Sequence, residues 1–215
     1  MLKTLFTITS VFFLFSCSVI NQNNIAPGYT QAYSAIKSSI FGSDNEIDEN
    51  LIKSIPYASM IVRIGNGPRG LMILESKSGN EYTWVSADGV YLVIKEGRII
   101  QSEGLINNLD EINSSYNFWK NPTYKERVNY FSFSNPEFNN LKVFSSSEEL
   151  GNVEVDLKLQ ILELRLIEEN IYAPLVGWSE VNKYWLDNDN FVWKSHQNIS
   201  PNLPVISYIV TKKPR

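Results

Sequence analysis

The sequence is poor in the residues that most often carry catalysis. Its 215 residues include one cysteine, Cys17, and one histidine, His196. A single cysteine excludes an intramolecular disulfide. The chain also lacks a Gly-x-Ser-x-Gly elbow, a phosphate-binding loop and a dinucleotide-binding fingerprint. We therefore expect a protein that is not an enzyme and needs no cofactor.

Positive charge is also scarce. The chain has 19 basic and 23 acidic residues, for a formal net charge of −4. Such a composition gives no electrostatic reason to bind nucleic acid, and it contains no polybasic segment of the kind that binds acidic membranes. The one marked apolar run, residues 5–15, is far shorter than the roughly 20 residues that a membrane-spanning helix needs.

What the N-terminus does have is the pattern of an export signal. Lys3 precedes the apolar run, as a positive residue does in secretory signal peptides. Leu14, Phe15, Ser16 and Cys17 then resemble the lipobox of bacterial lipoproteins, although Phe15 is bulkier than usual. The alternative is an ordinary signal peptide followed by an incidental cysteine.

The lipobox resemblance implies lipidation and location. Residues 1–16 would be removed, and Cys17 would carry a diacylglyceryl group and further acyl chains such as palmitate. Two or three chains anchor a protein almost permanently, because each buried CH₂ contributes about 0.8 kcal/mol. By resemblance to enterobacterial sorting rules, Ser18 favours the outer membrane. We expect a lipid-anchored protein of the outer membrane that faces the periplasm.

The mature chain divides into a tether and one domain. Residues 17–28 are polar and rich in turn formers, which is typical of a short linker after the lipid. Residues 29–41 place apolar side chains at spacings of three and four, which predicts an amphipathic helix. Residues 29–215 are expected to form a single mainly-β domain with this one N-terminal helix.

From residue 55 onward, short apolar or aromatic runs alternate with turns, many of which contain glycine. Closely spaced strands with tight turns predict a curved antiparallel meander, half-barrel or barrel-like, because parallel strands need long crossovers. Residues 105–126 are less regular. The expected strands are 57–64, 71–75, 82–86, 91–94, 98–101, 127–133, 141–144, 178–186, 191–196 and 205–211, with a hairpin turn at 187–190.

The clearest strand pattern covers residues 153–167. Apolar residues alternate with polar ones as far as Ile161, and the alternation then changes phase at Leu162. A strand cannot change its buried face without an extra residue, so we predict a β-bulge or sharp bend there. The alternative is a break into two strands.

Three features of the sequence are candidate sites. His196 lies at the end of a predicted strand, and we expect a structural or solvent-facing role for it. Asp187 and Asp189 resemble the start of a calcium loop, but the later positions depart from that motif, so we expect a turn without metal. In the acidic couplets 148–149 and 168–169, neighbouring side chains point to opposite faces of a strand, so neither is a paired acid–base site.

Tryptophans are spread along the predicted strands. Aromatic side chains stack on sugar rings, but they are also common core and sheet residues. We expect each tryptophan to lie in the core or on a sheet face. The five are Trp84, Trp119, Trp178, Trp185 and Trp193.

An ordered set of short segments resembles the group 4 capsule polysaccharide lipoprotein family (GfcB/YjbF). The segments are residues 55–60, Tyr82 with Trp84 and Ser86, residues 97–100, residues 184–187, and Val192 with Ser195 and Gln197. The resemblance covers nearly all of the mature chain. It implies a curved antiparallel sheet and a role beside capsule or exopolysaccharide export machinery, and it supplies no catalytic residues.

Three hypotheses follow. The first is a non-enzymatic lipoprotein that assists assembly or export of capsular polysaccharide, with the membrane, other export proteins and the polymer itself as candidate partners. The second is a periplasmic carrier that holds a lipid or glycan on the concave face of the sheet. The third is a polysaccharide-modifying enzyme. A deep apolar groove would favour the carrier, exposed aromatic side chains would favour sugar binding, and facing carboxylates in a cleft would favour the enzyme.

Overall fold

The computed structural model describes residues 47–113 and 126–214. The expected signal peptide, Cys17, the tether and the predicted helix at 29–41 lie outside these residues, as does Trp119. No helix in the described ranges is long and apolar enough to cross a membrane.

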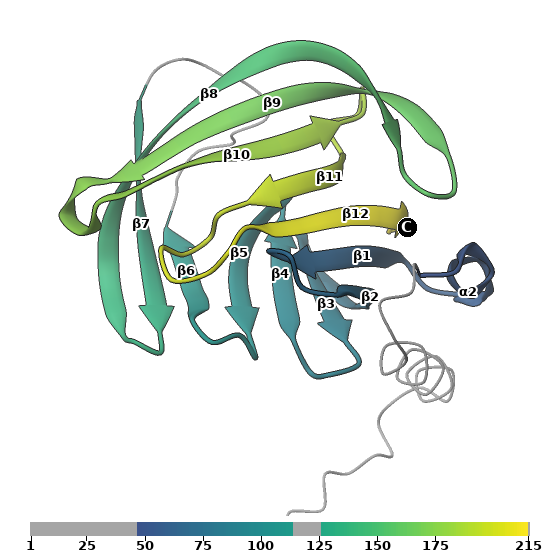
Figure 1. Ribbon diagram of the computed structural model, residues 1–215, viewed down its shortest axis with the longest axis horizontal. Helices are drawn as coiled ribbons and strands as arrows, with labels where there is room; N and C mark the ends of the chain where they lie inside the picture. The colour runs from purple at the N-terminus through teal and green to yellow at the C-terminus, as the bar shows by residue number, and fades with distance from the viewer. Residues whose placement is uncertain (1–46, 114–125, 215) are drawn as a thin grey trace, which may run out of the picture.

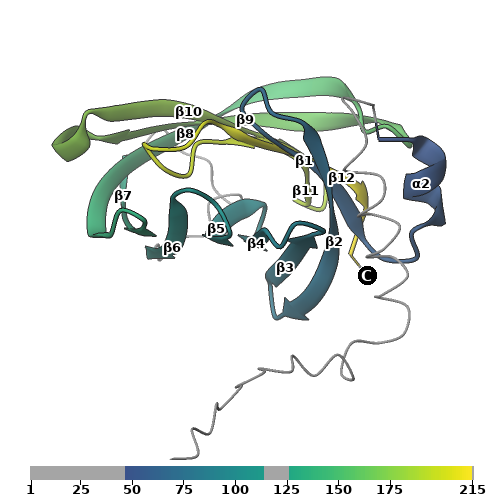
Figure 2. The same cartoon turned by 60° about the horizontal axis from the view of Figure 1, so that its bottom comes forward.

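Twelve strands form one antiparallel sheet that curves into a nearly closed barrel (Figure 1). They are β1 (Ser59–Ile64), β2 (Arg69–Ser78), β3 (Glu81–Ser86), β4 (Tyr91–Lys95), β5 (Arg98–Glu103), β6 (Asn108–Asn113), β7 (Arg127–Ser134), β8 (Phe138–Asp156), β9 (Ile161–Ala173), β10 (Trp178–Leu186), β11 (Val192–Gln197) and β12 (Ile206–Lys212). Figure 2 shows β3–β7 as one wall and β8–β12 with β1 as the opposite wall. The predicted mainly-β, barrel-like meander is confirmed.

The first and last strands of the chain, β1 and β12, pair in the middle of the sheet. The strand order is β5-β4-β3-β2-β1-β12-β11-β10-β9-β8-β7-β6. The two edges, β5 and β6, are consecutive in sequence and meet without a backbone ladder. A side chain bridges this seam: the backbone N–H of Leu109 donates to Ser102 Oγ at 2.9 Å.

The interior is a packed apolar core. Along β12, Ile206, Tyr208 and Val210 are buried, whereas Ser207 and Ile209 are half-buried on the other face. This period of two is what a sheet with one buried face requires. Side chains that alternate in this way fill the barrel rather than line a channel.

A short helix packs on the outside of the barrel. Helix α2 (Glu49–Ser54) begins at Asp48, whose carboxylate accepts a hydrogen bond from the backbone N–H of Asn50 at 3.0 Å. Its Ile52 belongs to a second buried cluster with Ile61 and Leu71 of the sheet. This helix was not predicted from the sequence, because six residues are too few to establish a helical period.

The prediction for residues 153–167 was wrong. The chain does not bulge at Ile161 but turns back, so that β8 ends at Asp156 and β9 begins at Ile161. The turn lacks glycine and proline. It is built instead by the Asp156 carboxylate, which accepts the Lys158 N–H at 2.7 Å, with Lys158 at a φ of 74°. The alternative of two strands is therefore correct.

Two further differences concern β8 and its neighbours. The predicted strand at 141–144 is part of a strand of 19 residues, and the irregular stretch 105–126 contains β6. A register shift in β8 does exist, but it lies between Glu149 and Gly151, where Gly151 has a φ of 103°. Glycine tolerates this backbone conformation because it has no Cβ.

Candidate functional site

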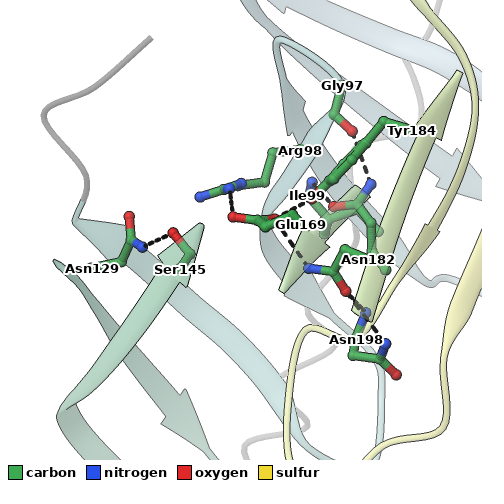
Figure 3. Close-up of polar contacts among 10 residues, drawn as sticks. Gly97, Arg98, Ile99, Asn129, Ser145, Glu169, Asn182, Tyr184 and Asn198 are labelled. Carbon is green, nitrogen blue, oxygen red and sulfur yellow. Dashed lines mark hydrogen bonds and ion pairs between the residues drawn. The ribbon is translucent and has the colours of Figure 1, made fainter. Parts of the chain in front are cut away.

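A polar cluster lies inside the barrel around Glu169 of β9 (Figure 3). The Glu169 side chain is 1% exposed. Its Oε1 forms an ion pair with the guanidinium of Arg98 on β5. Its Oε2 accepts hydrogen bonds from the Tyr184 hydroxyl at 2.9 Å and from Asn182 Nδ2 at 3.2 Å. Both carboxylate oxygens are therefore satisfied, as a buried charge requires.

Next to this ion pair, one glutamine joins opposite walls of the barrel. Gln197 Nε2 donates to the carbonyl oxygen of Gly97 at 2.8 Å, and its Oε1 accepts the Ile99 N–H at 2.9 Å. The Tyr208 hydroxyl donates to the same Gly97 oxygen at 2.7 Å. Segments that carry the family resemblance, around residues 97–100 and 184–197, thus meet in space although they are far apart in the chain.

Burial and charge fix the protonation of this cluster. Burial lowers the pKa of Arg98, but the Glu169 carboxylate and the Tyr184 side chain together outweigh burial, so the pKa is raised. The pKa of Tyr184 lies well above its ordinary value because the phenol is buried and next to Glu169. At neutral pH, Arg98 is therefore charged and Tyr184 is a neutral donor. A hollow of about 10 Å³ beside them has room for about one water molecule.

One hydroxyl in this interior lacks a partner. Ser147 of β8 is the cross-strand partner of Glu169 and therefore faces the same side. Its Oγ is buried and has no hydrogen-bond partner among the residues that the structure describes. Two residues along β8, Ser145 Oγ accepts a hydrogen bond from Asn129 Nδ2 of β7 at 3.0 Å (Figure 3). A single water next to Ser147 would satisfy its hydroxyl.

The prediction that Glu168 and Glu169 point to opposite faces of a strand is confirmed. Glu169 points inward, whereas Glu168 is half-buried on the outer face, where it pairs with Lys183 at 2.6 Å. The two carboxylates therefore do not face each other. Sequence reasoning missed the Arg98–Glu169 pair, because a pairing across the barrel leaves no spacing signal in the chain.

The segment at 187–190 forms the predicted turn. Asp187 Oδ1 accepts the N–H groups of Asp189 and Phe191, both at 2.9 Å. Its Oδ2 accepts the Trp193 indole N–H at 2.9 Å and Lys213 Nζ at 3.1 Å. Both oxygens are thus occupied by donors, and no group of metal-binding side chains occurs in residues 47–113 and 126–214.

His196 lies half-buried on the outer face of β11. Its ring meets the Trp185 ring edge-on, with centroids 5.0 Å apart. Burial, Lys194 and Lys183 lower the pKa of His196 below its usual 6.5. The expected structural or solvent-facing position agrees with this geometry.

The tryptophans are core residues, and other aromatics are exposed. Four of the five tryptophans, Trp84, Trp178, Trp185 and Trp193, are buried. On the outer face of β7–β9, however, the side chains of Val128, Tyr130 and Tyr172 are about 40% exposed. Val128, Phe144 and Tyr172 are successive cross-strand partners, and the last two rings stack at 4.9 Å. We call Val128, Tyr130, Phe144 and Tyr172 the outer aromatic patch.

Polar groups surround the outer aromatic patch. Lys142 Nζ lies 4.7 Å from the centre of the Phe144 ring, and the Tyr172 hydroxyl donates to Glu126. Flat apolar ring faces beside hydrogen-bonding groups suit the alternating C–H and hydroxyl surfaces of a sugar. Tyr130 and Tyr172 are thus exposed aromatic side chains, the feature that the sugar-binding hypothesis predicted.

A second hollow lies near the C-terminal end of the chain. It measures about 50 Å³ and is lined by, among others, Trp84, Phe191 and Tyr208. Pockets for small molecules usually measure several hundred Å³. Neither this hollow nor the one at Arg98 accommodates an acyl chain, so neither supports the carrier hypothesis.

Comparisons with known proteins agree with the resemblance seen in the sequence. The family model described as "Group 4 capsule polysaccharide lipoprotein gfcB, YjbF" matches residues 8–209. Among curated Escherichia coli K12 proteins, the uncharacterized lipoprotein YjbF is 23% identical over 169 residues, covering 74% of this chain and 77% of its own length. The uncharacterized lipoprotein GfcB is 30% identical over 80 residues, 37% of each chain.

A solved structure shares the fold. The crystal structure of the hypothetical lipoprotein YmcC from Escherichia coli K12 superposes with a TM-score of 0.72 at 20% identity. The match covers 85% of this chain and 96% of that one. With the family model matched over most of the sequence, the chain belongs to the group 4 capsule polysaccharide lipoprotein family.

Proposed function

We propose that this protein is a non-enzymatic lipoprotein that assists the assembly or export of a capsular polysaccharide or exopolysaccharide. The family match over residues 8–209 is the observation that carries this proposal. The lipobox around Cys17 adds an anchor, which would hold the domain at the periplasmic face of the outer membrane. Other export proteins and the polymer are the proposed partners.

The geometry supports a binding role rather than a catalytic one. Acid–base hydrolysis of a glycosidic bond usually uses two carboxyl groups that face each other across the substrate. The interior cluster instead holds one carboxylate, Glu169, fully bonded to Arg98, Asn182 and Tyr184. The outer aromatic patch, in contrast, is exposed and has the chemistry of a sugar-contacting surface.

A clean deletion of the gene in its own bacterium tests this proposal. We expect surface polysaccharide to fall and polymer-degrading activity to stay unchanged. The wild-type gene should restore the polysaccharide. Cys17→Ala should not, because the protein would lack the thiol that carries the lipid. Normal surface polysaccharide in the deletion strain would contradict the proposed function.

The anchor has its own test. Mass spectrometry of the protein purified from envelopes should find an N-terminal peptide that begins at an acyl-modified Cys17. Labelled fatty acid should be absent from Cys17→Ala. A native protein that begins at another residue, or label retained in the variant, would contradict the lipidation.

A further inference from the structure

A row of basic side chains crosses the outer face of four strands. Lys183 of β10 pairs with His196 of β11, His196 with Ser207 of β12, and Ser207 with Arg63 of β1. Direct partners in antiparallel strands point to the same face. The row lies outside the barrel, because the alternate residues, such as Tyr184 and Tyr208, are buried inside. Strands are about 4.8 Å apart, so the row spans roughly 14 Å.

A further cation lies beside this row. Lys194 is two residues from His196 on the same face of β11, and its Nζ lies 4.6 Å from the centre of the Trp185 ring. Trp185 is buried and forms the floor of this part of the surface. We call Lys183, His196, Ser207, Arg63 and Lys194 the basic row.

The charges of the basic row are poorly neutralised. Several cations elsewhere have carboxylate partners: the ion pairs are Lys53–Glu49, Lys95–Glu81, Arg98–Glu169, Arg165–Glu149 and Lys213–Asp187. Within the described ranges, Arg63, Lys194 and His196 have no carboxylate partner. Glu168, at the β9 end, pairs with Lys183. Arg63 and Lys194 are thus two cations on this outer face without a carboxylate partner among the described residues, in a chain whose net charge is −4.

The surroundings of His196 favour an anion at this place. Lys194 and Lys183 face it from β11 and β10, and Ser207 faces it from β12. The nearest acid in this row, Glu168, is already bound to Lys183. Burial and the two lysines lower the pKa of His196, so its neutral form is favoured in the free protein. An anion between Lys194 and His196 would offset the repulsion and raise that pKa.

We propose that the basic row binds the carboxylate groups of an acidic polysaccharide. The match is one of charge: a linear polymer with repeated carboxylates complements several cations spread along one face. Ser207 adds a hydroxyl for a sugar hydroxyl. The outer aromatic patch continues the same face, since Tyr172 and Glu168 both lie on the outer side of β9. The inference rests on the proposed function for the identity of the polymer and adds its charge and its place of contact.

His196 provides a direct test, because it is the one histidine in the chain. The mature lipidated protein, labelled with ¹³C in histidine and held in neutral detergent micelles, would be titrated with pH and followed by NMR. Polygalacturonate fragments should raise the pKa of His196. The same fragments with fully methyl-esterified carboxylates should leave it unchanged. No change with polygalacturonate would overturn the proposal, and would leave the deletion test of the proposed function intact.

A matched pair of double variants tests whether binding depends on the basic row or only on the total charge of the protein. Arg63→Gln with Lys194→Gln should weaken polygalacturonate binding at least about tenfold, because two charge-assisted contacts are lost. Lys53→Gln with Lys95→Gln removes the same charge from α2 and β4 and should bind like the wild type. Equal loss in both double variants would overturn the proposal. A pKa shift of His196 with phosphatidylglycerol as large as that with polygalacturonate at equal charge would also overturn the proposal. It would indicate that the surface attracts anions without selectivity.

Discussion

The polar cluster inside the barrel and the basic row on its outer face differ in whether their charges have partners within the fold. Inside, Glu169 is bound by Arg98, Tyr184 and Asn182, and each of its oxygens has a donor. Outside, Arg63, Lys194 and His196 lie on one face of β1, β11 and β12 without a carboxylate partner among the described residues. A buried charge needs a partner within the fold, whereas a surface charge can be left for another molecule. The comparison therefore assigns stability to the interior cluster and binding to the outer face.

The largest expected effect comes from removing the buried carboxylate. Glu169→Ala would remove the carboxylate that neutralises the Arg98 guanidinium inside the barrel, which costs about 3–5 kcal/mol. The adjacent Glu168→Ala removes the same group from the outer face and should cost less than about 1 kcal/mol. Urea denaturation measures both. Similar losses of unfolding free energy in the two variants would contradict the conclusion that the interior cluster stabilises the fold more than the outer ion pair does.

The next largest loss of stability is expected from a substitution in a turn that borders the interior cluster. Gly97 has a φ of 82°, and a Cβ there would lie 2.1 Å from Val192 Cγ2. Gly97→Ala combines backbone strain with overpacking and should cost about 2–4 kcal/mol. Gly79 has a φ of 58° with open space around it.

Gly79→Ala is therefore the control for backbone strain alone, with an expected cost of about 1 kcal/mol. Thermal and urea unfolding of both variants give the difference. If the Gly97 variant were as stable as the Gly79 variant, Val192 would be able to move aside with no loss of stability. The barrel wall at this point would then not be tightly packed.

The positions of the strands could be predicted from the sequence better than the side-chain contacts between strands. Strand positions followed from short apolar or aromatic runs bounded by turns, as for residues 178–186, which match β10. The turn at 157–160 was missed because its signal is the Asp156 side chain and not a glycine. The Arg98–Glu169 pair and the basic row depend on which strands lie next to each other and in which register. The sequence of one strand does not determine its register with a strand that is distant in the chain.

Acid stability gives a smaller effect, at the rim of the barrel. Burial would raise the pKa of Asp187, but hydrogen bonds from Phe191, Trp193 and Lys213 outweigh it and lower the pKa below 3.8. A carboxylate with a lowered folded-state pKa stabilises the protein above pH 3.8, and this contribution is lost as the pH falls through the folded-state value. Asp187→Asn should remove this part of the acid transition.

Asp189→Asn changes a neighbouring acid in the same turn and should leave the acid transition like that of the wild type. Urea midpoints measured from pH 7 down to pH 2.5 provide the comparison. If the Asp187 variant retained the full pH dependence of the wild type, the network around Asp187 would not contribute to stability.

The smallest effect is expected on the outer face. Arg63 donates through Nε to the Gly67 carbonyl oxygen at 2.9 Å but has no carboxylate partner in the described chain. Arg63→Gln should change the free energy of unfolding by less than about 0.5 kcal/mol, as for most surface substitutions. A loss as large as that of Glu169→Ala would show that Arg63 supports the fold, and that its position in the basic row has a structural reason.

The most direct measurement combines the proposed role with the proposed surface in living cells. Surface polysaccharide would be quantified in the deletion strain carrying Arg63→Gln with Lys194→Gln, or Lys53→Gln with Lys95→Gln, at equal levels of anchored protein. The account predicts that the first pair leaves the polysaccharide close to the deletion level and that the second restores it. Full polysaccharide with the first pair would contradict the claim that this outer face handles the polymer.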